Sequence, residues 1–192
     1  FIHAQMQNHY WEDPVDYEVK ISKGFTELKQ SAYTASANEP PLDFRQSPHD
    51  KSNMAKYLFG GFKKCLYPVQ KFQSDSERKL AVILEREAIK WFKPAKGQFQ
   101  IFYRSGSDHP EYQPDFVAET EKTIYMLEPK ARGEMESDEV LGKKQVALQW
   151  CKNASVHVRT YNGKPWNYIL IPHDAIAENI TLDMLAKQFR YD

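Results

Sequence analysis

Cysteine is scarce in this chain, and so are long apolar runs and any excess of one charge. Only two cysteines occur, Cys65 and Cys151, which are too few for a disulfide scaffold and lack the paired spacing of a zinc site. We therefore expect buried, inert thiols and a reducing, cytoplasmic setting. No segment approaches the roughly 20 apolar residues of a membrane span, so we expect a soluble protein without a membrane partner.

The charges balance, with 26 Lys and Arg against 26 Asp and Glu among 192 residues. No global field therefore draws the chain to nucleic acid, and any polyanion binding must come from a local patch. The hydrophobic content of 41% and charged content of 27% exclude disordered, collagen-like and coiled-coil chains and predict one globular domain. The sequence also lacks a Walker loop, a dinucleotide fingerprint and a nucleophile elbow.

The first third of the chain is the least regular part. A strand, VDYEVKIS, is expected within residues 15–30, and a polar, proline-containing stretch follows at 31–53. An apolar and aromatic cluster at 54–69 is expected to pack beside the main domain. We therefore divide the chain into an N-terminal arm or remnant, 1–53, and a domain, 54–192. Because the first residue is Phe, we expect a piece of a longer chain.

From Ser74 onward the hydrophobic patterns and turn residues predict a defined order of elements. We expect helices at 75–92, 139–152 and 182–189, and strands at 98–104, 112–119, 123–130 and 166–172. Helix, three strands, helix and strand is the order of an α/β fold with a mixed central sheet flanked by helices. Glu121-Lys122 is the expected turn between the second and third strands.

Two acids face each other in this predicted hairpin. With the turn at Glu121-Lys122, Asp115 lies directly opposite Glu128, where like charges repel unless a cation compensates them. A magnesium ion would do so, because it prefers oxygen ligands and often binds one or two carboxylates. Alternation places Lys130 on the same face as Glu128. Alternatively, the hairpin is solvent-exposed and Lys130 simply neutralises Glu128.

A third acid, Glu77, stands at the start of the first helix. At about 100° per residue it falls on the core-facing stripe with Ala81, Leu84, Ala88 and Trp91, where a bare carboxylate needs a partner. Ser74-Asp75-Ser76-Glu77 also matches a capping box, in which the glutamate bonds the helix N-terminus and needs no metal. The sequence leaves open whether Glu77 has such an inward partner or only caps the helix.

The helix acid, Pro114-Asp115 and Glu128-Pro129-Lys130 in this order resemble the motif of the PD-(D/E)xK nuclease superfamily. In particular, SDSERKLAVILE, YQPDFVAE, YMLEPKA and QWCKNA in this order look like the C-terminal endonuclease domain of the type III restriction enzyme Res subunit. The resemblance implies a restriction-endonuclease-like core and a catalytic Mg²⁺, with Mn²⁺ as a substitute. It assigns the metal to Asp115, Glu128, the Pro129 carbonyl and Glu77, with Lys130 positioning or activating the attacking water. Asp75 and Glu85 are alternatives to Glu77 for the acid that the helix contributes.

The resemblance also implies partners. Double-stranded DNA would be the substrate, and a methyltransferase subunit and an ATP-driven helicase motor of the same longer chain would supply target choice and translocation. Candidate phosphate contacts are Lys143, Lys144, Gln145 and Arg132, although neighbouring acids at 134–139 would repel DNA. Two other functions stay open: a catalytically silent nucleic-acid-binding or docking domain of the same fold, and an interaction domain with solvated charges.

Overall fold

The computed structural model describes residues 27–34, 39–103 and 107–191. The strand expected within residues 15–30, VDYEVKIS, lies outside the described residues. In the part of the chain that is described, no helix is long and apolar enough to cross a membrane.

A four-stranded mixed sheet forms the centre of the fold. In spatial order its strands are β4 (Lys90–Phe92), β7 (Phe116–Glu119), β8 (Ile124–Lys130) and β9 (Trp166–Pro172). β7 is antiparallel to both of its neighbours, and β9 runs parallel to β8. The apolar run of β9 is buried on both faces, as expected for a strand with helices on either side.

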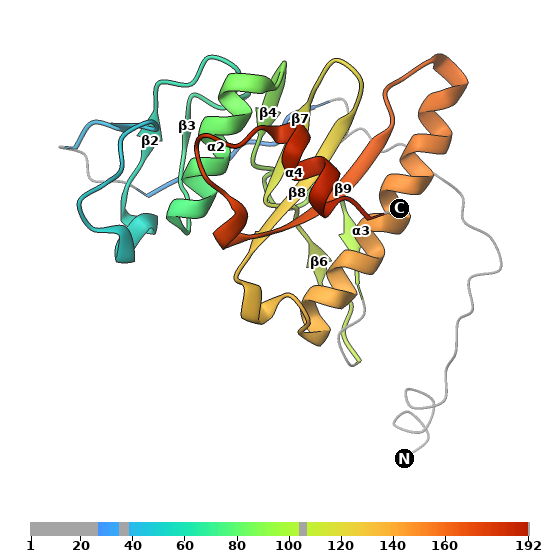
Figure 1. Cartoon of the computed structure of the whole chain (residues 1–192). Coiled ribbons are helices and arrows are strands. Elements are labelled where there is room, and N and C mark those ends of the chain that lie inside the picture. The colour runs from blue at the N-terminus through green and yellow to red at the C-terminus, as the bar shows by residue number, and fades with distance from the viewer. Residues whose placement is uncertain (1–26, 35–38, 104–106, 192) are drawn as a thin grey trace.

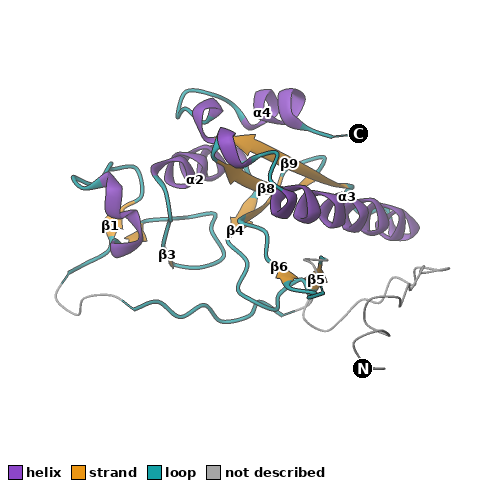
Figure 2. Cartoon of the chain, turned by 90° about the horizontal axis from the view of Figure 1, so that it is seen from below, coloured by secondary structure: helices purple, strands orange, loops and turns teal. Residues whose placement is uncertain are grey.

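Helices cover the two faces of this sheet (Figures 1 and 2). On one face, α2 (Asp75–Glu87) and α4 (Leu182–Phe189) pack against inward residues of the strands, including Phe116 and Leu127. On the other face, α3 (Asp138–Val158) packs against Val117 and Met126. The predicted mixed α/β class is therefore confirmed, as are the expected positions of β9 and α4.

The hairpin register follows the prediction. Phe116 pairs with Leu127 and Glu119 with Ile124, and the turn is closed by the Thr120 amide, which donates to the Thr123 carbonyl at 2.9 Å. One step before β7 in this register, Asp115 falls opposite Glu128. The pleat thus directs both acids toward the α3 side of the sheet.

The first predicted helix, 75–92, was wrong at its C-terminal end. The helix ends at Glu87, because Ala88 adopts extended backbone, and Lys90–Phe92 forms β4 instead. Trp91 pairs with Ala118 there, and its backbone also bonds Lys64 and Leu66. Trp91 is buried in the core, as the helical pattern predicted, but it belongs to a strand and not to a helix.

The strand predicted at 98–104 was also wrong in its role. Among its described residues, only Ile101–Phe102 (β5) form a strand, which pairs with β6 (Glu111–Tyr112) in a separate two-stranded sheet. Gln100 has a φ of 53°, which interrupts extended backbone. The predicted strand 112–119 is accordingly split at Pro114, and β4 takes the place of the first core strand.

The predicted helix 139–152 is six residues longer at its C-terminal end. Ser137 caps α3 through its side-chain oxygen, and the helix runs to Val158 before Asn162 turns the chain at a φ of 58°. Short 3₁₀ turns occupy Lys51–Lys56, Arg132–Glu134, Arg159–Tyr161 and His173–Ala175.

The segment before α2 adds a small sheet of β1 (Leu42–Asp43), β2 (Phe59–Gly60) and β3 (Val69–Gln70). Met54 and Phe59 belong to the core beneath α2, so the apolar cluster at 54–69 does pack beside the central domain. Phe44 is only 4% exposed in the same core. The domain boundary after residue 53 stays a prediction.

Candidate active site

The two hairpin acids share a buried environment at the edge where β7 begins. Glu128 is 5% exposed, and Asp115 is half-buried. Burial, together with the negative charge of Asp115, raises the pKa of Glu128 to about 8. Burial likewise raises the pKa of Asp115 to about 6. Because each acid disfavours the charge of the other, the pair holds a proton near neutral pH.

Three lysines surround the acid pair from different elements. Lys130, at the end of β8, places its Nζ 3.7 Å from Glu128 Oε1. Lys143 of α3 and Lys93, just after β4, also lower the pKa of Asp115 through their positive charges. These ammonium groups compensate part of the repulsion between the acids and form a cationic rim around them.

Tyrosine hydroxyls lie on the inner side of Glu128. The Tyr112 hydroxyl donates a hydrogen bond of 3.0 Å to Glu128 Oε2 from a buried position in β6. The Tyr168 hydroxyl of β9 is buried close by, and it has no hydrogen bond of ordinary geometry to a described residue. The charge of Glu128 adds to burial in raising the pKa of Tyr168. One carboxylate oxygen of Glu128 is therefore fixed by Tyr112, and the other faces Lys130.

Glu77 stands beside the site but has partners of its own. Its amide donates to the Ser74 Oγ at 3.1 Å, which is the expected N-cap. Its carboxylate accepts from the Gln73 amide at 3.3 Å and forms an ion pair with Lys93. Its negative charge still raises the pKa of Asp115, so the two carboxylates are close enough to interact. The capping geometry is present, and the role in metal support stays a prediction.

The two alternatives to Glu77, Asp75 and Glu85, interact with other side chains. Asp75 pairs with Arg78 at 2.7 Å, and Glu85 accepts from the Trp91 indole at 2.8 Å. Within the described residues, no three His, Cys, Asp or Glu side chains are grouped closely enough to hold a metal ion together. The candidate donor set for a cation is therefore Asp115 and Glu128, and the expected role of the Pro129 carbonyl stays a prediction. This set fits Mg²⁺, which commonly uses one or two carboxylates and completes its shell with water and substrate phosphate.

The four expected phosphate contacts are not all near the acids. Lys143 is, because its charge acts on both Asp115 and Glu128. Arg132 instead forms an ion pair of 2.9 Å with Asp174. Lys144 lies over the ring of Tyr191, with Nζ 3.5 Å from its centroid, and Gln145 is exposed on α3. Of the four, only Lys143 faces the acid pair.

Sequence reasoning missed Lys93 and Tyr112. Lys93 was hidden because the helical pattern was extended through residue 92, whereas β4 carries it to the ring of Phe116, 4.8 Å from its centroid. Tyr112 stands three residues before Asp115, and its contact with Glu128 depends on the split between β6 and β7. A tyrosine preceding a Pro-Asp pair was the available signal, but it does not specify a partner.

Comparison with known proteins gave no match: no family model, no curated protein and no solved structure matches this chain.

Proposed function

We propose that this chain is a metal-dependent DNA endonuclease domain that hydrolyses phosphodiester bonds at Asp115, Glu128 and Lys130. The observation that carries the proposal is the acid pair itself. Two carboxyl groups in one buried site, both with raised pKa values, are costly to the fold unless they serve a cation or a reaction. A lysine 3.7 Å from one of them completes the set that the PD-(D/E)xK resemblance requires.

The arrangement of the elements supports the same proposal. α2, β4, β7, β8, α3 and β9 give helix, three strands, helix and strand around one mixed sheet, and β5 and β6 of the separate small sheet stand between β4 and β7 in the chain. The restriction-endonuclease-like core is proposed on this order together with the motif positions. Asp115 precedes the second of these strands and Glu128 lies in the third, as the resemblance implies.

Each residue has a defined task in the proposed reaction. Asp115, Glu128 and the Pro129 carbonyl would hold Mg²⁺ or Mn²⁺, which supplies charge neutralisation at the scissile phosphate. Lys130 would orient the attacking water or bind a phosphate oxygen as a compact positive charge. Tyr112 fixes the orientation of Glu128 through its hydrogen bond. Lys143 would attract the phosphodiester backbone to the rim.

The resemblance to the Res subunit of type III restriction enzymes suggests the substrate and the partners. As the nuclease domain of a type III restriction enzyme, the chain would cut double-stranded DNA delivered by an ATP-driven helicase motor of the same polypeptide. A methyltransferase subunit would supply target recognition. The lack of a Walker loop in this sequence means that the motor would have to lie elsewhere in the longer chain.

A second candidate function is a catalytically silent nucleic-acid-binding or docking domain of the same fold. The ion pair between Glu77 and Lys93 favours it, because it neutralises the third acid that the resemblance assigns to the metal. The absence of a three-residue metal cluster in the described part of the chain points the same way.

Nicking of supercoiled plasmid separates the two functions. The wild-type chain is incubated with Mg²⁺, with Mn²⁺ and with EDTA, alongside Asp115→Asn and the exposed control Lys187→Ala. The nuclease proposal predicts metal-dependent nicking that Asp115→Asn reduces by at least 100-fold, a size typical for loss of a catalytic group. Nicking of equal rate in Asp115→Asn, or none in any sample, would favour the silent domain.

A further inference from the structure

A cavity of about 470 Å³ lies between α3, β9 and the last described residues of the chain. Its lining includes Lys152 and Gln145 of α3, Asn167 and Tyr168 of β9, and Arg190 and Tyr191 after α4. Figure 1 shows the C-terminal end of the chain beside α3. We call this cavity the α3–β9 groove. Its volume falls within the range of about 300–1,000 Å³ that small-molecule sites occupy.

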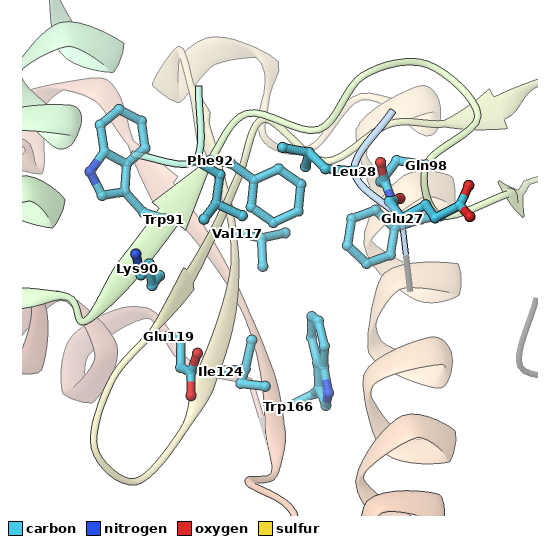
Figure 3. Close-up of a pocket in the computed structure, with 12 residues that line it drawn as sticks. Glu27, Leu28, Lys90, Trp91, Phe92, Gln98, Val117, Glu119, Ile124 and Trp166 are labelled. Atoms are coloured by element: carbon cyan, nitrogen blue, oxygen red, sulfur yellow. The ribbon is translucent and has the colours of Figure 1, made fainter. Parts of the chain in front are cut away.

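The charge of the groove is of one sign. Lys152 and Arg190 are both exposed cations, and no carboxylate occurs among the described residues that line it. A second cavity, of about 380 Å³, has aromatic walls and charges of both signs, from Glu27, Glu119 and Lys90 (Figure 3). In a chain of zero net charge, a groove with cations alone selects for an anion.

The groove adjoins the acid pair through two connections. Tyr168 lines the groove, and it stands on β9 two residues before Leu170, which pairs with Glu128 of β8. Consecutive lysines of α3 also connect the acid pair and the groove. The charge of Lys143 lowers the pKa of Glu128, and Lys144 lies over the ring of Tyr191, which lines the groove.

We propose that the α3–β9 groove binds one nucleotide of the DNA strand whose neighbouring phosphodiester lies at Asp115 and Glu128. Lys152 and Arg190 bind the phosphate of that nucleotide, and the amides of Gln145 and Asn167 contact its base or sugar. Lys152 is suited to this because it makes no ion pair with a described residue. The inference rests on the proposed nuclease function and names how its substrate is held.

The test measures DNA binding without cleavage. A fluorescein-labelled DNA duplex is titrated in EDTA with the wild-type chain, with Lys152→Ala and with Lys187→Ala, and fluorescence anisotropy gives the affinity. Lys187 is a matched control, because it is an exposed lysine of α4 on the other face of the sheet, paired with Asp183. We expect Lys152→Ala to weaken binding about tenfold and to lower the salt dependence by about one phosphate contact.

Equal affinities of Lys152→Ala and Lys187→Ala would overturn the inference. Competition by free deoxyadenosine monophosphate separates the two sources of a nucleotide. We expect no competition, whereas competition that Lys152→Ala removes would assign the groove to a free nucleotide and overturn its role in strand binding.

Plasmid nicking is scored separately. Loss of DNA affinity in Lys152→Ala without any wild-type nicking would contradict the nuclease proposal alone, and nicking with unchanged affinity would contradict the groove alone.

Discussion

Glu128 lies between the hydroxyl of Tyr112 and the ammonium group of Lys130, and its protonation links the site to the stability of the fold. Its pKa is about 8 in the folded protein and 4.5 ordinarily, so between these values the folded state keeps a proton that the unfolded chain has lost. The free energy of unfolding in metal-free buffer should therefore fall as pH rises through this window, by up to about 1.4 kcal/mol per pH unit.

Urea unfolding at several pH values in EDTA checks this dependence. Asp115, with a pKa raised to about 6, adds to the fall in the lower part of the window. Glu128→Gln carries no titrating proton there, so its unfolding free energy should stay nearly constant from about pH 6 to pH 8. A wild-type slope of zero, or the same slope in Glu128→Gln, would show that Glu128 is not a buried acid with a raised pKa.

The two tyrosines offer a matched pair of substitutions that each remove one hydroxyl. Tyr112→Phe takes away the hydrogen bond to Glu128 and should lower the free energy of unfolding by about 1–2 kcal/mol. Tyr168→Phe removes a buried hydroxyl without a hydrogen bond of ordinary geometry, so stability should be unchanged or slightly increased. Denaturant midpoints at one pH give both values, and equal losses would contradict the described contacts.

At the scale of elements, α2 and β4 are joined by the ion pair between Glu77 and Lys93. The two side chains are 7% and 15% exposed, so their interaction is less screened than a surface pair. A double-mutant cycle with Glu77→Gln and Lys93→Met should give a coupling of about 1–3 kcal/mol. The exposed pair Asp183 and Lys187 in α4 is the control and should give about 0.3–0.5 kcal/mol. Comparable couplings in the two cycles would argue against a structural role for the pair.

Local patterns predicted the hairpin and missed β4, and the difference is physical. The alternation of apolar residues and the short turn allow few registers for β7 and β8, and a one-residue slip would turn their apolar side chains outward. Residues 88–92 could continue the helix by pattern alone, because Trp91 falls on the same stripe as Ala88. Pairing with Ala118 of β7, far away in the sequence, decides the conformation instead.

The residues of the candidate site also differ in how far local sequence patterns could predict them. Asp115, Glu128 and Lys130 could be predicted to lie together because one hairpin carries all three. Lys93 and Tyr112 could not, since they reach the acids from β4 and β6 through tertiary packing. Arg132 was predicted to contact phosphate because it follows Lys130 closely in the sequence. This position did not reveal its ion pair with Asp174.

At the scale of the whole molecule, the proposed DNA contacts lie on one side of a chain that has no net charge. The acid pair, Lys143 and the α3–β9 groove all lie on the α3 side of the sheet, whereas α2 and α4 cover the other face. DNA binding should therefore weaken when lysines of α3 are removed and should be insensitive to exposed lysines of α4. The anisotropy titrations of Lys152→Ala and Lys187→Ala measure this asymmetry.

The most direct test of the central claim is calorimetric titration of the chain with Mn²⁺ in the absence of DNA, in two buffers of different ionisation enthalpy at pH 7. We expect one site that Asp115→Asn and Glu128→Gln each abolish. We also expect the release of about one proton, because the acid pair must lose its shared proton to bind the metal. Binding that persists in both variants, or no binding by the wild-type chain, would contradict the assignment of the acid pair as a metal site.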